Sequence, residues 1–235
     1  MFRGQSVLLV IPALDEEDAI GRVLAGVDRE IVNTIVVADN GSRDRTAERA
    51  KRGGATVVSE PRRGYGSACL RALREGPRTD LVVFMDADGS DDPAEIAPML
   101  AHLVDTGAEF VVGSRVLGHV EPGALTPIQG FGNRLTCVLV RLFWGVRFTD
   151  LGPFRAIRRE ALERLEMADP DFGWTIEMQV KAAQRRLRST EFPVSCRVRR
   201  AGRSKVSGTI SGVYHAGTRI LGYVFGAKWN ELVGR

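Results

Sequence analysis

Short apolar runs alternate with amphipathic stretches over the first half of the chain. Five runs are rich in β-branched residues and do not alternate with polar ones, which predicts strands covered on both faces: Val7–Ile11, Thr34–Ala38, Ala55–Ser59, Leu81–Met85 and Phe110–Gly113. Helical spacing between them predicts four helices: Glu16–Val27, Asp44–Arg52, Gly66–Arg74 and Pro93–Val104. This order predicts an α/β fold, in which a mainly parallel, Rossmann-like sheet carries helices on both faces.

The pattern changes after Ser114, where a Gly- and Pro-rich loop begins. The predicted elements beyond it are an apolar helix at Arg134–Gly145, a helix around Trp174–Arg185, a short strand pair around Ser189–Arg199, and a weakly helical segment at Thr209–Trp229. We therefore expect one domain at 1–206, with halves at 1–114 and 115–206, and an amphipathic tail at 207–235.

Polar clusters follow three of the predicted strands: PALDEED after the first, DNGSRD after the second and DADGSDD after the fourth. Ligands of parallel α/β sheets bind beyond the carboxyl ends of the strands. The clusters therefore predict one binding site at this edge of the sheet.

Asp86 and Asp88 stand two residues apart at a strand end and point the same way. Two such carboxylates repel each other and raise each other's pKa unless a cation lies between them. Their hard oxygen atoms suit Mg²⁺ or Mn²⁺, which proteins hold through one or two carboxylates together with substrate phosphates. Two of the acids that follow, Asp92 and Glu95, are predicted to form a capping box. Asp91 is predicted to be a solvated loop residue.

Charge is uneven along the chain, whose formal net charge is +4. From Lys181 to the end, twelve Lys and Arg residues face two acids, which gives +10 there and leaves −6 for the preceding part. This favours a cation site in the front part and a phosphate or anionic-lipid contact in the rear. Three scattered cysteines without a C-x-x-C pair fit a reducing compartment, and no apolar stretch is clean enough to span a bilayer.

Nine runs appear in an order that resembles the family 2 glycosyltransferases of GT-A fold, especially the branch of dolichyl- and polyprenyl-phosphate sugar synthases. They are IPALDEED, VVADNGSRDRTAE, GYGSACLRAL, FMDADGSDDPAEI, GSR, NRL, DLGPFRAIRREAL, GWTIEMQVKAA and GRSK. The resemblance covers about residues 6–207. It implies a nucleotide-sugar donor, inverting transfer and a divalent metal, Mg²⁺ or Mn²⁺.

The resemblance also implies roles for individual residues, which we write as expectations. The donor side is Pro12, Asp15, Glu16, Asp39, Asp86 and Lys205, with Asp86 and Asp88 at the metal. The acceptor phosphate is expected at Arg115 and Arg134, and the catalytic residues at Asp150, Glu177 and Arg155. Three departures from the family pattern leave the donor base and sugar open. Asp15 and Asn40 stand where many members have Asn and Asp, Tyr65 stands where Lys is common, and Gly89-Ser90 replaces a frequent Leu-Gln.

A lipid phosphate is already anionic, so its attack on a sugar needs positioning cations more than a general base, whereas a sugar hydroxyl needs a base. We therefore expect a hexose transfer to polyprenyl phosphate by a cytoplasmic protein that sits peripherally on the inner face of the membrane. A soluble or glycan hydroxyl acceptor, a nucleotidyltransferase and a non-catalytic nucleotide-binding module stay open as alternatives. A homodimer or a membrane-protein partner also stays open, and no nucleic acid is expected.

Overall fold

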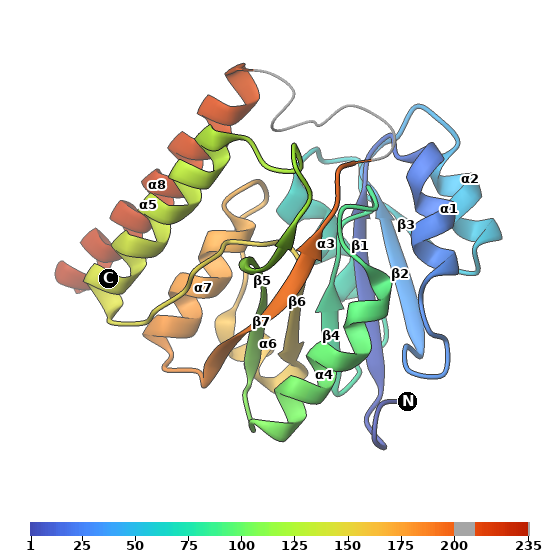
Figure 1. The fold of residues 1–235 in the computed structure, drawn as a ribbon, viewed down its shortest axis with the longest axis horizontal. Coiled ribbons are helices and arrows are strands. Elements are labelled where there is room, and N and C mark those ends of the chain that lie inside the picture. The colour runs from blue at the N-terminus through green and yellow to red at the C-terminus, as the bar shows by residue number, and fades with distance from the viewer. Residues whose placement is uncertain (200–209, 235) are drawn as a thin grey trace.

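The computed structural model describes residues 1–199 and 210–234, with side chains from 217 onward in the second range. The strands are β1 (Val7–Ala13), β2 (Thr34–Asp39), β3 (Thr56–Ser59), β4 (Leu81–Phe84), β5 (Phe110–Val120), β6 (Arg155–Arg158) and β7 (Ser189–Cys196). The helices are α1 (Glu17–Ala25), α2 (Thr46–Arg52), α3 (Tyr65–Glu75), the 3₁₀ turn η1 (Pro93–Glu95), α4 (Ile96–Asp105), α5 (Pro127–Trp144), α6 (Arg159–Leu165), α7 (Trp174–Gln184) and α8 (Ile210–Leu232). Figure 1 shows their arrangement.

One seven-stranded sheet has the order β3-β2-β1-β4-β6-β5-β7, and β6 is antiparallel to both of its neighbours. The predicted mainly parallel α/β sheet is confirmed. One detail differs, because Ser189–Cys196 is a single strand that pairs in parallel with β5 instead of forming a strand pair of its own. The sequence did not predict β6, whose apolar content is two residues between arginines.

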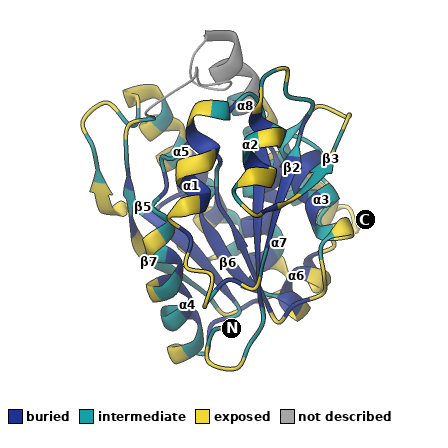
Figure 2. Ribbon diagram, turned by 90° about the vertical axis from the view of Figure 1, so that its right-hand side faces the viewer, coloured by how far each residue is buried: buried dark blue, intermediate teal, exposed yellow. Residues whose placement is uncertain are grey.

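Alternate side chains of the central strands enter two separate cores, one on each face of the sheet. On β1, Leu9 and Ile11 face the layer of α1, α2 and α4, whereas Leu8 and Val10 face the layer of α3, α5, α6 and α7. Figure 2 shows the buried strands between these layers. The carboxyl ends of β1, β2 and β4 meet at one edge because these strands are parallel neighbours.

Helices α5 and α8 lie side by side at one end of the molecule (Figure 1). α5 starts earlier than predicted, because Thr126 caps the helix ahead of Pro127 and forms a capping box with Gln129 of the first turn. The two helices meet near their carboxyl ends, where the rings of Phe143 and Phe225 lie 5.8 Å apart. Within the described residues, no helix combines the length and apolar character needed to cross a bilayer. The expected boundary at 206/207 lies outside the described residues.

Candidate active site

The loops after β1 and β2 are fastened to each other through Asp15 and Glu16. Asp15 has a left-handed backbone (φ 50°). Its N–H donates to Ser42 Oγ (3.0 Å), and its Oδ1 accepts from the Arg43 N–H (2.7 Å). The Glu16 N–H donates to Thr46 Oγ1 (2.7 Å). Asp15 therefore shapes the rim of the site.

Pro12 and Asp39 lie at the adjoining ends of β1 and β2. Pro12 is buried in register with Ala38, and Ala13 is in register with Asp39. Asp39 is half-buried, and its Oδ1 accepts from the Ser42 N–H (3.3 Å). The other carboxylate oxygen has no contact described here, so Asp39 stays a candidate for binding a donor.

Asn40 explains one departure from the family pattern. Its Nδ2 donates to the carbonyl oxygens of Glu60 (3.0 Å) and Arg62 (2.7 Å), and its Oδ1 accepts from the Gly64 N–H (2.9 Å). A carboxylate would supply no donor for the two carbonyl groups. Asn40 thus ties the loop after β2 to the loop before α3.

Three carboxylates meet where β4 ends. Asp88 and Asp91 are buried, at 8% and 3% exposure, and Asp86 is half-buried. Burial and the neighbouring Asp88 raise the pKa of Asp86 to about 7. Burial, Asp86 and Asp88 raise the pKa of Asp91 well above its ordinary value. The prediction that Asp91 is solvated was wrong, because the loop turns at Gly89 (φ 76°) and Asp91 Oδ2 accepts from the Asp86 N–H (3.2 Å).

Tyr65 is a site residue whose role the sequence did not reveal. Its hydroxyl donates to Asp86 Oδ1 (3.0 Å). Burial and the charge of Asp86 raise the pKa of Tyr65 well above its ordinary value, so the phenol keeps its proton. Asp86 thus accepts a hydrogen bond from a neutral donor.

Arg199 connects the ends of β1 and β4. Its Nη1 donates to Glu16 Oε1 and its Nη2 to Asp88 Oδ2, both at 2.7 Å. The other Asp88 oxygen, Oδ1, accepts from the Ser90 N–H (2.8 Å). Arg199 is thus a cation in direct contact with the predicted metal ligand.

Asp92 and Glu95 have structural contacts, but not as a capping box. Asp92 caps η1 by accepting from the Ala94 N–H (3.1 Å) and forms an ion pair with Arg197. The Glu95 carboxylate instead accepts from the Ser195 N–H (2.9 and 3.0 Å). Both acids therefore hold the end of β7 against the loop after β4.

The acids at β4 suit a divalent metal only together with further ligands. Their oxygen atoms are of the hard type that Mg²⁺ and Mn²⁺ prefer. Among the described residues, no group of three or more His, Cys, Asp or Glu is arranged to hold a metal by itself. Asp88 and Asp86 would therefore hold the metal with oxygen atoms of a bound phosphate.

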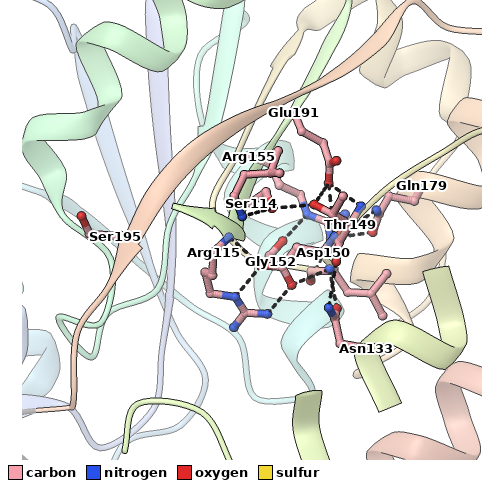
Figure 3. A network of polar contacts seen from close by, with 12 residues as sticks. Ser114, Arg115, Asn133, Thr149, Asp150, Gly152, Arg155, Gln179, Glu191 and Ser195 are labelled. Atoms are coloured by element: carbon pink, nitrogen blue, oxygen red, sulfur yellow. Dashed lines mark hydrogen bonds and ion pairs between the residues drawn. The ribbon is translucent and has the colours of Figure 1, made fainter. Parts of the chain in front are cut away.

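Arg115 and Asp150 form a buried bidentate pair on the other side of the site. Asp150 has no exposure, and its Oδ2 and Oδ1 each lie 2.7 Å from Arg115 nitrogens, Nε and Nη2 (Figure 3). The N–H groups of Arg115 and Leu151 also donate to this carboxylate, each at 2.8 Å. Burial alone would raise the pKa of Asp150, but Arg115 holds it below its ordinary value.

The segment around Asp150 is fixed by a further set of buried contacts (Figure 3). Glu191 Oε1 accepts from the N–H groups of Thr149 (2.8 Å) and Asp150 (3.2 Å). Gln179 Nε2 donates to the Asp150 carbonyl (2.9 Å), and Asn133 Oδ1 accepts from the Leu151 N–H (2.8 Å). The turn at residues 150–153 (DLGP) is thus held from β7, α7 and α5 at once, and together with these contacts it forms the DLGP network.

Arg155 and Glu177, both expected to be catalytic, are also buried, and their side chains are engaged in hydrogen bonds and ion pairs within the protein. Arg155 is 1% exposed and donates to the carbonyls of Gly152 (2.7 Å) and Thr175 (2.6 Å), and burial lowers its pKa to about 10. Glu177 is 2% exposed, and its Oε2 accepts from the Asp169 N–H (2.8 Å) while its Oε1 lies 2.8 Å from Lys181 Nζ. Their catalytic roles stay predictions, and their contacts are those of positioning residues.

The two remaining basic residues differ in placement. Arg134 is exposed on α5, next to Asn133 of the DLGP network. Lys205 lies outside the described residues. The structure thus brings together Glu16, Asp86 and Asp88, which are expected to bind the donor, and Arg115 with Asp150, which are expected near the acceptor.

Comparison with known proteins gives a consistent picture. The model of the family described as glycosyl transferase family 2 matches residues 8–166. An uncharacterised glycosyltransferase of Mycobacterium tuberculosis is 38% identical over 211 residues, covering 89% of this chain and 93% of that protein. A dolichyl-phosphate hexose transferase of Haloferax volcanii is 32% identical over 200 residues, covering 84% and 85%.

Solved structures agree with this assignment. Glucosyl-3-phosphoglycerate synthase of Mycobacterium tuberculosis, in complex with Mn²⁺, UDP-glucose and phosphoglyceric acid, superposes with a TM-score of 0.77 at 25% identity. The match covers 96% of this chain and 80% of that one. The seven-stranded sheet is therefore that of a GT-A glycosyltransferase, and the chain belongs to glycosyl transferase family 2.

Proposed function

We propose that this glycosyltransferase is a metal-dependent, inverting enzyme that moves a hexose from a UDP- or GDP-sugar to polyprenyl phosphate. The half at 1–114 binds the donor, and the half at 115–206 binds the acceptor. The donor and metal are supported by the carboxylates of Asp86 and Asp88 and by relatives of this fold that hold UDP with Mn²⁺ or Mg²⁺. A bound divalent metal would neutralise the leaving diphosphate.

The observation that supports a phosphate acceptor is that both predicted catalytic acids are already engaged by cations and N–H groups of the protein. Asp150 is engaged by Arg115, and Glu177 by Lys181 and backbone N–H groups. A hydroxyl acceptor would need a carboxylate or imidazole able to take its proton, whereas a phosphate acceptor arrives as an anion. Arg134, exposed beside the DLGP network, and the outer edge of Arg115, whose side chain is 18% exposed, would position that anion.

Two relatives support a lipid carrier. Besides the dolichyl-phosphate hexose transferase, an undecaprenyl-phosphate mannosyltransferase of Micrococcus luteus is 28% identical over 246 residues, covering 97% of this chain and 98% of that protein. The second candidate is a soluble phosphate-bearing acceptor, which is favoured by the superposition on glucosyl-3-phosphoglycerate synthase with phosphoglyceric acid.

The outer face of α5 offers a surface that fits a membrane. Five apolar residues are exposed at a spacing of three and four, which places them on one stripe of the helix: Ile128 (67%), Phe131 (71%), Leu135 (36%), Val138 (54%) and Leu142 (73%). Between Glu121 and Asp150 the chain has three arginines and no acid. An apolar stripe flanked by cations is typical of helices that lie in an anionic membrane interface.

Transfer assays test the proposal. The protein is incubated with Mn²⁺, radiolabelled UDP-glucose, UDP-galactose, GDP-mannose or UDP-N-acetylglucosamine, and either polyprenyl phosphate in vesicles or phosphoglyceric acid. We expect label in the solvent-extractable lipid with at least one donor. Label only in the water-soluble product would replace the lipid carrier by the soluble acceptor, and no transfer in any combination would refute the proposed activity.

Vesicle binding tests the membrane surface separately. Leu142→Ser together with Phe131→Ser is expected to reduce binding to vesicles of anionic phospholipid without a change in thermal stability, because both side chains are exposed. Arg141→Gln on α5 is expected to weaken the same binding, whereas Arg22→Gln on α1 is the control with an equal change in charge. Both arginines are exposed. Equal binding by all variants would remove α5 as the contact surface.

A further inference from the structure

The contacts of Arg199 point to a function beyond a static ion pair. Its guanidinium touches Asp88 Oδ2 and Glu16 Oε1 at 2.7 Å, and its side chain is 23% exposed. The two acids are largely enclosed, with side-chain exposures of 11% for Asp88 and 7% for Glu16. The cation therefore compensates negative charge on the carboxylate that is predicted to bind the metal.

The backbone that leads to Arg199 is fixed independently of this ion pair. The Arg197 N–H donates to the Ser90 carbonyl (2.9 Å), inside the loop that carries Asp88. The Val198 N–H donates to Glu121 Oε2 (2.8 Å), so two backbone groups beside Arg199 are held without any part of the Arg199 or Arg197 side chain. Arg199 is thus delivered to the acids by a segment anchored to the same loop, so its side chain can leave Asp88 while its backbone stays close.

A divalent metal at Asp88 would compete with the Arg199 guanidinium for the negative charge of this carboxylate. Asp88 Oδ1 already accepts from the Ser90 N–H and Oδ2 from Arg199, so a metal that binds this carboxylate would take over charge compensation that Arg199 now supplies. Two cations at neighbouring positions repel each other in a partly desolvated site. A nucleotide diphosphate changes this balance, because it supplies anionic oxygen atoms that the released guanidinium can bind.

We propose that Arg199 is a resident counter-cation that competes with the divalent metal for Asp88 and moves to the diphosphate of the donor when both bind. The metal alone then binds weakly, because it must expel a cation, and it binds strongly when a diphosphate receives that cation. Arg199 thereby couples metal binding to nucleotide binding. This inference rests on the proposed metal-dependent use of a nucleotide-sugar.

Mn²⁺ binding without any transfer reaction tests the coupling. The electron paramagnetic resonance signal of free Mn²⁺ is titrated with the full-length protein, alone and with saturating UDP or GDP. We expect the wild type to bind Mn²⁺ at least about fivefold more tightly with one of the nucleotides, as for a typical coupling between two sites. Arg199→Gln is expected to bind Mn²⁺ alone more tightly than the wild type and to lose most of the gain from nucleotide.

Arg197→Gln is the matched control, because it removes the same charge from the same segment but from a side chain that pairs with Asp92 and not with Asp88. It is expected to keep the coupling of the wild type, and circular dichroism confirms that both variants fold. Unchanged Mn²⁺ affinity and coupling in Arg199→Gln, or weaker binding of Mn²⁺ alone, would overturn the inference and leave the proposed function intact. A wild type that binds no Mn²⁺ even with nucleotide would overturn both.

Discussion

Removal of the Asp150 carboxylate should destabilise the folded protein before it affects any chemistry. In Asp150→Ala, the Arg115 guanidinium keeps its charge, with a side chain that is 18% exposed, and loses its only described ion-pair partner. The N–H groups of Arg115 and Leu151 lose an acceptor as well. Breaking a buried ion pair by removing one partner costs about 3–5 kcal/mol.

The expected loss can be measured by urea denaturation and by calorimetry. For a chain of this length, each kcal/mol corresponds to roughly 2–4 °C in melting temperature, so a decrease of about 6–20 °C is expected. Glu163→Ala is the control. Glu163 binds Arg78 with the same bidentate geometry, at 2.9 and 3.0 Å, but the two side chains are 49% and 70% exposed. An exposed pair contributes about 0–1 kcal/mol, so this variant should melt close to the wild type.

The contribution of Asp150 should also depend on pH. Because Arg115 holds the pKa of folded Asp150 below its ordinary value, the unfolded chain takes up a proton first as the pH falls. The stabilisation is present above about pH 4, the pKa of an unperturbed Asp, and is lost below it. The difference between wild type and Asp150→Asn should therefore shrink in acid.

An Asp150→Ala protein whose free energy of unfolding stays within about 1 kcal/mol of the wild type would refute the structural role.

Three further variants test the donor side and the α7 contact. Asp88→Ala should abolish Mn²⁺-dependent binding of UDP or GDP while the circular dichroism spectrum stays unchanged; binding that persists with this variant would exclude Asp88 as a metal ligand. Burial and Asp88 raise the pKa of Asp86 to about 7, so folded Asp86 retains a proton that the unfolded chain releases near pH 4, and stability falls as the pH rises between these values. Asp86→Asn should flatten that decline in urea unfolding measured from pH 4 to 8, and an equally steep decline would contradict the shift. Glu177→Gln should lower the free energy of unfolding by about 2 kcal/mol, because Lys181 and the Asp169 N–H lose a charged acceptor; normal melting with lost transfer would instead make Glu177 catalytic.

The fold was predictable because its signal is local. Apolar runs such as Leu81–Met85 and the polar clusters that follow them depend on neighbours in sequence, and they predicted both the central strands and the edge that carries the acids. Strand β6 escaped prediction because its only apolar residues are Ala156 and Ile157, which lie between Arg155 and Arg158. Arg155, an arginine at 1% exposure, donates to the carbonyl of nearby Gly152 and to that of Thr175, which only the folded chain brings near it.

In the candidate site, too, the sequence indicates which residue types are present, whereas only the folded chain shows which groups they contact. The spacing of Asp86 and Asp88 predicted mutual repulsion. The folded chain adds Asp91, which accepts from the Asp86 N–H, and Tyr65, whose hydroxyl donates to the Asp86 carboxylate. Loop acids are usually solvated, so the sequence favoured a solvated Asp91, and only the turn at Gly89 reverses that expectation. The roles expected for Asp150 and Glu177 came from the family resemblance, but a carboxylate's chemistry is set by the donors around it.

Arg115 and Arg199 both pair with carboxylates, but the surroundings of the two ion pairs favour different functions. Arg115 binds a carboxylate that also accepts two backbone N–H groups and has no exposure, so its release would strand buried charge. Arg199 binds two carboxylates from different strand ends, and Asp88 remains slightly exposed beside the half-buried Asp86. A metal with a diphosphate can take over its place without leaving an acid uncompensated. The first pair therefore fixes the turn around Asp150, whereas the second has the exposure and the partners that the proposed exchange with a metal and a diphosphate requires.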